Sequence, residues 1–294
     1  MRSVIAALKQ KKILVSDGAW GTLLQNRGLK AGECPEAWNL THPEQVKNVA
    51  SSYIKAGSDL VLTNSFGGSS FKLTHFGLSD KVSEINRAAA VLSRSAAGDT
   101  HLVLGSMGPT GKMLMMGDVT ESEWIEAFGN QASALIDGGA DGLCIETMSA
   151  LDEALCAVRG AREHTDCEIA CTLTFEKTRQ NDYRTMMGVS PTQAAETLLN
   201  AGVNIIGANC GNGMERMIDI AKEIRQVSSD VPILIHANAG MPVVRDGETI
   251  FPETPAETAR WMAPLMEAGA DIIGGCCGTT PDHIRAIVKE VGKQ

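Results

Sequence analysis

The chain has 294 residues, of which 44% are hydrophobic and 21% charged. This is the composition of an ordinary globular protein, which excludes a disordered or fibrous chain. The formal net charge of -9 argues against a nucleic-acid partner, because proteins that bind phosphate backbones carry a basic patch or excess. We expect a small molecule or another protein as the partner.

The amino terminus gives no sign of a targeting segment. Residues 1–12 lack the ordered charged, apolar and cleavage regions of a signal peptide and predict a short amphipathic helix. No apolar stretch approaches the roughly 18 residues that span a bilayer, so no membrane is expected. Eight cysteines in a chain of this length are too sparse for a disulfide scaffold. These features favour a protein of the reducing cytoplasm.

A weak internal repeat organises the chain. Four times a helix-like segment ends at a short Gly-x-Asp or Gly-x-Asn motif, and an apolar run follows. Glycine at a helix end supplies the left-handed cap conformation. The apolar runs predict eight strands, at 13–19, 60–66, 102–107, 142–146, 169–175, 204–209, 232–238 and 271–275. Between them, helical periodicity predicts helices that include 44–56, 121–138, 191–202, 214–227 and 254–269.

This alternation of buried strands and amphipathic helices predicts a parallel sheet covered on both faces. Eight such units favour a closed (β/α)8 TIM barrel over an open doubly wound sheet, and no linker divides the chain. We therefore expect residues 1–294 to form one barrel domain. Reactive groups in such barrels lie at the carboxyl ends of the strands, which makes the last residue of each apolar run informative.

Three cysteines follow predicted strands that end on the same rim. Cys210 follows the sixth strand, and Cys276 and Cys277 follow the eighth within Gly-Gly-Cys-Cys-Gly. Three thiolates suit Zn²⁺ and leave its fourth tetrahedral position open for a substrate, the arrangement of a catalytic site. Buried core cysteines are the alternative, which we favour for an isolated Cys210 but not for the adjacent pair. A zinc ion here would lower the pKa of a substrate thiol and make it nucleophilic at neutral pH.

Two acidic residues also end strands. Asp17 and Glu146 are candidates for binding an ammonium group, and the backbone N–H groups of the glycine-rich turn that begins at Gly18 are candidates for binding a carboxylate. The alternative is structural: Asp17 would cap the following helix, and Glu146 would pair with a neighbouring Arg or Lys.

Several other features receive no functional role. The methionines of 113–116 and 186–187 are interpreted as adaptable packing. Segment 178–188 is predicted to be a long loop that can cover a site. Segment 105–111 lacks the Lys-Ser/Thr ending of a phosphate loop and is interpreted as a turn after a strand. His236 lies on the seventh strand, where its role is ambiguous.

The chain resembles the homocysteine S-methyltransferase family, which includes the homocysteine module of cobalamin-dependent methionine synthase and betaine–homocysteine methyltransferase. The resemblance covers nearly the whole chain, and its most specific motif is the segment 274–281. The other matching segments are 17–22, 63–66, 146–148, 185–188, 209–210 and 238–240. The chain departs from many relatives by having Trp20 in place of Met and Ala237 in place of Pro.

This resemblance implies a zinc barrel in which Cys210, Cys276 and Cys277 bind the metal and the sulfur of homocysteine completes the coordination. Asp17, Gly18 and Glu146 would then bind the amino-acid end of the substrate, and Asn238 would lie near the metal. Segment 108–112 looks closer to the methionine synthase module than to the S-methylmethionine enzymes, which favours a separate methylcorrinoid protein as the methyl donor. S-methylmethionine and betaine are the alternative donors, and another small thiol is the alternative acceptor.

Two hypotheses come from other classes. A lyase or aldolase that forms a Schiff base needs a lysine at a strand end, and none of the eight predicted strands ends in one. A non-catalytic zinc or thiol-binding module of a larger methyl-transfer complex would bind the thiol without methylating it. Metal analysis and a methyl-transfer assay distinguish these possibilities.

Overall fold

The computed structural model describes residues 2–245 and 248–293. At its centre eight parallel strands form one sheet in the order β1, β12, β9, β8, β5, β4, β3, β2. The predicted (β/α)8 barrel is confirmed, and each of the eight predicted apolar runs overlaps one of its strands. Their bounds are β1 Leu14–Val15, β2 Leu60–Leu62, β3 Leu102–Met107, β4 Gly142–Met148, β5 Glu168–Leu173, β8 Ile205–Gly213, β9 Ile233–Asn238 and β12 Ile272–Gly275.

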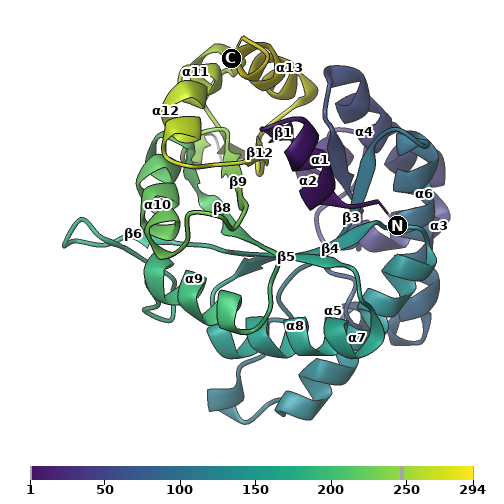
Figure 1. Cartoon of the computed structure of the whole chain (residues 1–294). Helices are drawn as coiled ribbons and strands as arrows, with labels where there is room; N and C mark the ends of the chain where they lie inside the picture. The colour runs from purple at the N-terminus through teal and green to yellow at the C-terminus, as the bar shows by residue number, and fades with distance from the viewer. Residues whose placement is uncertain (1, 246–247, 294) are drawn as a thin grey trace.

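Helices surround these strands, as Figure 1 shows. The larger ones are α4 Pro43–Ala56, α6 Val82–Ala97, α7 Glu121–Asp137, α8 Leu151–His164, α9 Pro191–Asn200, α10 Met214–Val227 and α13 Pro281–Val291. The shorter ones are α1 Val4–Gln10, α2 Gly21–Gln25, α3 Trp38–Thr41, α5 Ser70–Thr74, α11 Pro255–Ala259 and α12 Met262–Glu267, with single 3-10 turns η1 Pro35–Ala37, η2 Ser79–Lys81 and η3 Leu114–Met116. No helix within the described ranges is long and apolar enough to cross a membrane.

Alternation along each strand separates two cores. Side chains that point outward, such as Ile233 and Ile235, pack under the helices, whereas Leu234 points into the barrel. Helix α1 closes the amino end of the barrel, because Val4 is fully buried against the interior cluster that includes Leu234. The opposite, carboxyl end of the barrel therefore carries the open mouth.

The repeated Gly-x-Asp/Asn motif ties the strands together in pairs. At each copy the backbone N–H of the acidic or amide residue donates to a carbonyl of the preceding barrel strand, while its side chain accepts the N–H of that same partner residue. The pairs are Asp59 with Val15, Asp141 with Val103, Asn204 with Ile169 and Asp271 with Ile233. Each side chain thus satisfies a backbone donor at the strand start that the ladder leaves unpaired.

Barrel closure between β1 and β2 depends on one aspartate of the motif, Asp59, and on Asp17. The described residues of β1 and β2 share no ladder register. Instead Asp59 donates its N–H to the Val15 carbonyl at 2.7 Å, and the Asp17 carboxylate accepts the Leu62 N–H at 2.8 Å. Asp17 is therefore part of the wall of the barrel.

We predict that Asp141→Ala destabilises the fold by about 2–4 kcal/mol, because the buried carboxylate accepts the N–H groups of Arg2 and Val103 and an ion pair from Arg94. Urea unfolding measures the change. Asp137→Ala is the matched control, since Asp137 pairs with Arg87 on an exposed face and such pairs contribute roughly 0–1 kcal/mol. Equal, small losses for the two variants would contradict this role of the repeat.

Two parts of the chain differ from the predictions. The predicted loop 178–188 begins and ends as a loop but contains one strand of a short hairpin, β6 Glu176–Lys177 with β7 Tyr183–Arg184. The single helix predicted over 254–269 is wrong: α11 and α12 are separate helices. Pro264 explains the break, because proline has no N–H to donate and its ring clashes with the carbonyl four residues earlier.

Candidate functional site

The three predicted cysteine ligands come together at the carboxyl end of the barrel. The Sγ atoms of Cys210, Cys276 and Cys277 all lie within 4.8 Å of one another. All three side chains line a cavity of about 350 Å³. One of these cysteines lies in β8 and two follow β12, and β9 separates these strands in the sheet. The three thus form one cluster at the cavity.

The backbone around Cys276 and Cys277 is fixed on both sides. Cys276 donates its N–H to the Ala237 carbonyl at 2.7 Å, and the Cys277 carbonyl accepts the N–H of Ala239 at 2.9 Å. The turn is completed by Gly278, whose φ of 80° is left-handed. A Cβ at Gly278 would lie 2.2 Å from the Cβ of Phe251. Only glycine fits there, which explains the glycine after the cysteine pair.

Cys210 reaches the cluster through an unusual backbone. Its φ of 59° is left-handed, and the register of β8 with β9 shifts between Asn209 and Gly213. Such a bulge redirects a side chain that the regular alternation would point away. Cys210 therefore lines the cavity, although the residue before it, Asn209, is buried against Glu146 and Thr147.

The three thiols share protons unequally. Hydrogen bonds from Cys276 and Cys277 lower the pKa of the Cys210 thiol to about 3. The bond with Cys210 raises the pKa of Cys277 to about 11, and burial adds to this rise; the pKa of Cys276 is raised further for the same reasons. One thiolate stabilised by two thiols is an arrangement that releases protons when a cation binds to the sulfurs.

Glu146 and Gly18 line the same cavity as the cysteines. Glu146 is 8% exposed, and burial raises its pKa to about 7. Its carboxylate accepts a hydrogen bond from Ser106 Oγ at 2.5 Å. No Arg or Lys among the described residues forms an ion pair with it. The structural alternative for Glu146 is therefore wrong.

Asp17 lies behind the cavity wall rather than on it. The side chain is fully buried, and burial raises its pKa to about 6. Its Oδ2 accepts the Trp20 indole N–H and the Leu62 backbone N–H, each at 2.8 Å. It does not cap α2, which has no side-chain cap. Trp20 itself lines the cavity, so Asp17 orients one of the cavity's walls.

The turn that follows Asp17 offers backbone donors. Among the described residues no acceptor takes the N–H groups of Gly18, Trp20 or Gly21. Gly18 is tightly enclosed, because a Cβ there would lie 2.6 Å from Thr279 Oγ1. The turn can therefore present unpaired N–H groups to a bound anion.

Two inward side chains of β9 complete the site. Asn238 lies between Ala237 and Ala239, whose backbones bond those of Cys276 and Cys277, and its Oδ1 is buried and has no partner among the described residues. His236 lines the cavity, its Nε2 is likewise buried without a partner in the described chain, and burial lowers its pKa to about 4. Buried polar atoms without partners are uncommon and mark a place where a ligand completes the hydrogen bonding.

Sequence reasoning gave no role to Ser106, Asn209 or His236. All three are buried polar residues on the inward-facing sides of their strands. The alternation along each strand could have indicated them, because the inward-facing positions nearer the amino end of the same strands are apolar.

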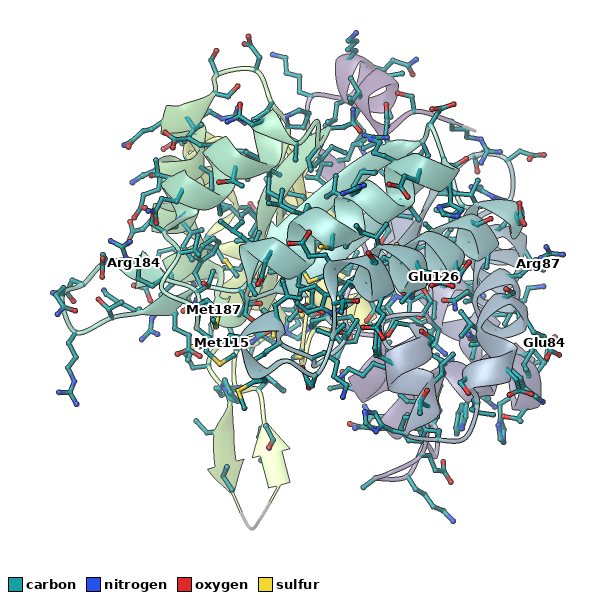
Figure 2. The ribbon with its side chains drawn as sticks, turned by 90° about the horizontal axis from the view of Figure 1, so that it is seen from below. Glu84, Arg87, Met115, Glu126, Arg184 and Met187 are labelled. Atoms are coloured by element: carbon teal, nitrogen blue, oxygen red, sulfur yellow. The ribbon has the colours of Figure 1, made fainter. Side chains whose placement is uncertain are left out.

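The interpretation of the methionines as packing is wrong for four of them. Met115, Met116 and Met186 are 74%, 72% and 68% exposed, and Met187 is 42% exposed. They follow β3 and β7 at the carboxyl end of the barrel. Figure 2 shows Met115 and Met187 on the face from which hairpin β10 Val243–Arg245 and β11 Glu248–Ile250 projects, opposite α1.

Comparisons with known proteins agree with this geometry. The family model "Homocysteine S-methyltransferase" matches residues 14–291. The chain is 32% identical to a methionine synthase of Mycobacterium leprae and 31% identical to one of Mycobacterium tuberculosis, in each case over 96% of the chain. It spans only 24% and 25% of those relatives.

Among solved structures, the homocysteine methyltransferase MmuM of Escherichia coli in its metallated form has the same fold. Its TM-score is 0.77 at 24% identity, and 96% of this chain and 97% of MmuM are covered. A methyltransferase from Methanosarcina mazei is more distant, with a TM-score of 0.63 at 13% identity over 99% of this chain and 97% of that one. The family match over nearly the whole sequence identifies the chain as a member of the homocysteine S-methyltransferase family.

Proposed function

We propose that the chain transfers a methyl group to the thiolate of homocysteine and so forms methionine, with Zn²⁺ held by Cys210, Cys276 and Cys277. The observation that carries this proposal is the meeting of three sulfurs within 4.8 Å at a cavity that also contains a buried carboxylate. Three sulfur donors from one rim suit Zn²⁺, whose catalytic sites keep the fourth position open. The unpaired Oδ1 of Asn238 beside the cluster also fits a cation there.

When bound, Zn²⁺ supplies a Lewis acid that lowers the pKa of the acceptor thiol and holds its sulfur. The chain's own residues fix the rest of the acceptor. Glu146 binds the ammonium group, and the unpaired N–H groups at Gly18, Trp20 and Gly21 bind the carboxylate. Asp17 contributes to acceptor binding by accepting a hydrogen bond from Trp20, which orients this side chain, and by its negative charge. Asn238 lies next to the metal position.

The methyl transfer is an in-line displacement. A lone pair of the homocysteine sulfur forms the new S–C bond while the bond between the methyl carbon and its donor breaks. The donor's leaving group keeps that electron pair, so no oxidant is needed. The thiol proton is lost before the step, which is why no Ser/His/Asp base is required at the strand ends. The chain's contribution is to hold the acceptor in one orientation and to exclude water from it.

We propose a methylcorrinoid protein as the donor. The exposed methionines at the mouth support this, because methionine-rich surfaces adapt to a protein partner. The methionine synthase relatives, whose length is about four times what the chain matches, are consistent with a donor carried by another module. The unpaired state of the described cysteines supports a reducing compartment such as the cytoplasm.

The test of this function is a methyl-acceptor assay on zinc-loaded protein with homocysteine and three donors: methylcobalamin, S-methylmethionine and betaine. Methionine formed from methylcobalamin supports the proposal. Methionine formed only from S-methylmethionine or betaine would keep the enzyme and replace the donor. Zinc and thiol binding without methyl transfer from any donor would identify a binding module instead.

We predict that Met115→Lys combined with Met187→Lys lowers methyl transfer from a methylcobalamin-loaded corrinoid module of a methionine synthase by about tenfold or more, because buried unpaired charges weaken an apolar interface. Transfer from free methylcobalamin should stay within about twofold. Val91→Lys is the matched control, since Val91 is an exposed apolar residue of α6. Equal losses with both donors would contradict the docking role of the mouth.

A further inference from the structure

Asn209 connects the two halves of the acceptor site. It is fully buried in the middle of β8 and immediately precedes Cys210. Its Nδ2 donates to Thr147 Oγ1 at 2.7 Å and lies 3.4 Å from Glu146 Oε2. Its Oδ1 accepts the Thr147 N–H at 2.7 Å and the Thr172 hydroxyl at 2.7 Å. Both polar atoms of the Asn209 side chain therefore form hydrogen bonds with the segment that carries Glu146.

Two residues beside Asn209 have strained backbones: Thr147, which its side chain contacts, and Cys210, which follows it in the chain. Thr147 has a φ of 62° and Cys210 a φ of 59°, which are left-handed values that β-branched and other non-glycine residues rarely adopt. The β4 ladder shifts register between Ile145 and Met148, around Thr147. Such conformations persist only where the surrounding contacts hold them. At Thr147 those contacts come from the Asn209 side chain, and at Cys210 the Asn209 carbonyl is fixed by Thr174 Oγ1 at 2.9 Å.

We propose that Asn209 is a positioning residue that holds the Glu146 carboxylate at a fixed place relative to the thiol site, so that the site selects thiols that carry an ammonium group. The inference rests on the proposed function, because it assigns the ammonium to Glu146 and the sulfur to the cysteine cluster. Asn209 reaches neither the substrate nor the metal. It acts through the left-handed turn at Thr147 and through its contact with Glu146.

The test compares two acceptors on zinc-loaded protein by calorimetry: homocysteine, and 4-mercaptobutanoate, which is homocysteine without its amino group. Wild-type protein is expected to bind homocysteine more tightly. Asn209→Ala is expected to weaken homocysteine binding by about 10- to 100-fold, the effect of losing hydrogen bonds that orient a charged group. Its zinc content should stay at that of the wild type, and its affinity for 4-mercaptobutanoate should change by less than about threefold.

Asn204→Ala is the matched control. Asn204 is also an asparagine that forms several hydrogen bonds beside β8, but it lies at the amino end of the barrel, where its Oδ1 accepts from Ile169 and Arg162. This variant should lose stability and keep the discrimination between the two thiols. Thr147→Gly in the Asn209→Ala background should restore part of the homocysteine affinity, because glycine adopts a positive φ without strain.

Three results would overturn the inference. In the first, the Asn209→Ala protein binds homocysteine as tightly as the wild type does. In the second, its affinity for homocysteine and its affinity for 4-mercaptobutanoate fall by the same factor. In the third, it loses its zinc together with homocysteine binding. If Asn209→Ala does not fold, Thr172→Val removes one donor to Oδ1 and should reduce the discrimination by about threefold; no reduction would again overturn the inference. Failure of the proposed function is seen separately, as a wild-type protein that holds no zinc or does not distinguish the two thiols.

Discussion

Replacing Cys276 by alanine is expected to remove both bound zinc and methyl transfer. The substitution leaves two sulfurs where three lie within 4.8 Å, and two protein ligands are too few for a catalytic zinc site, which needs three. The loss of activity should exceed the roughly 10- to 100-fold that follows removal of an outer-shell partner of a metal. Zinc content by atomic emission and methionine formation are measured on the same sample.

Cys144→Ala is the matched control for this variant. Cys144 is also a free thiol of the barrel, but it is fully buried and packs in the apolar interior cluster. It should keep its zinc and its activity while losing some stability. A Cys276→Ala protein that contains no metal and is fully active would contradict thiol activation by the cluster.

Replacing Glu146 by glutamine is expected to raise the KM for homocysteine by about 10- to 100-fold and to leave zinc in place. The amide has nearly the same shape but has lost the charge that attracts an ammonium group, and a hydrogen bond between charged groups is the stronger kind. Steady-state kinetics with homocysteine and 4-mercaptobutanoate measure the effect, which should be absent for the second thiol. A loss of zinc in this variant would contradict the separation of the two halves of the site.

The pH dependence follows from the pKa of Glu146, which burial raises to about 7. Below that pH the carboxyl is protonated, so homocysteine binding by the wild type should weaken as the pH falls from 8 to 6. The Glu146→Gln protein should lose the part of this dependence that Glu146 causes and keep only the part that comes from loss of the thiol proton. An unchanged wild-type profile would indicate that Glu146 does not bind the ammonium.

Protein stability should change in the opposite direction. The carboxyl titrates near its ordinary value of 4.5 in the unfolded chain and near 7 in the folded one. Between these values the native state holds a proton that the unfolded state has lost, so the carboxyl's contribution to the free energy of unfolding falls as the pH rises through this window. Glu146→Gln should therefore be more stable than the wild type at pH 8. In the wild type, the buried carboxylate that binds the substrate lowers the stability of the fold.

The fold could be predicted because its signals are local and repeated. Each apolar run between helical segments became a barrel strand, and the Gly-x-Asp/Asn motif marks four strand starts that use the same hydrogen bonds. The adjacent cysteines at 276 and 277 were recognisable because glycines surround them. These features need only neighbouring residues in the sequence, which is why the sequence alone indicates them.

The remaining parts of the site depend on contacts between distant segments. The left-handed conformations of Thr147 and Cys210 are held by Asn209 and the β8 bulge, and neither residue type signals a positive φ. Asp17 was interpreted from its place at a strand end, whereas its burial and its bond to Leu62 arise from barrel closure. Its direct contact with a substrate stays a prediction. Exposure of the methionines depends on where their loops leave the barrel.

The most direct test of the central claim is the metal content and metal coordination of the purified, reduced protein. About one zinc per chain is expected, with three sulfur ligands by X-ray absorption spectroscopy and a fourth sulfur after homocysteine is added. Protein that is prepared without chelators or oxidation and holds no zinc, or holds zinc with fewer than three sulfurs, would contradict the three-cysteine site and the acceptor mechanism built on it.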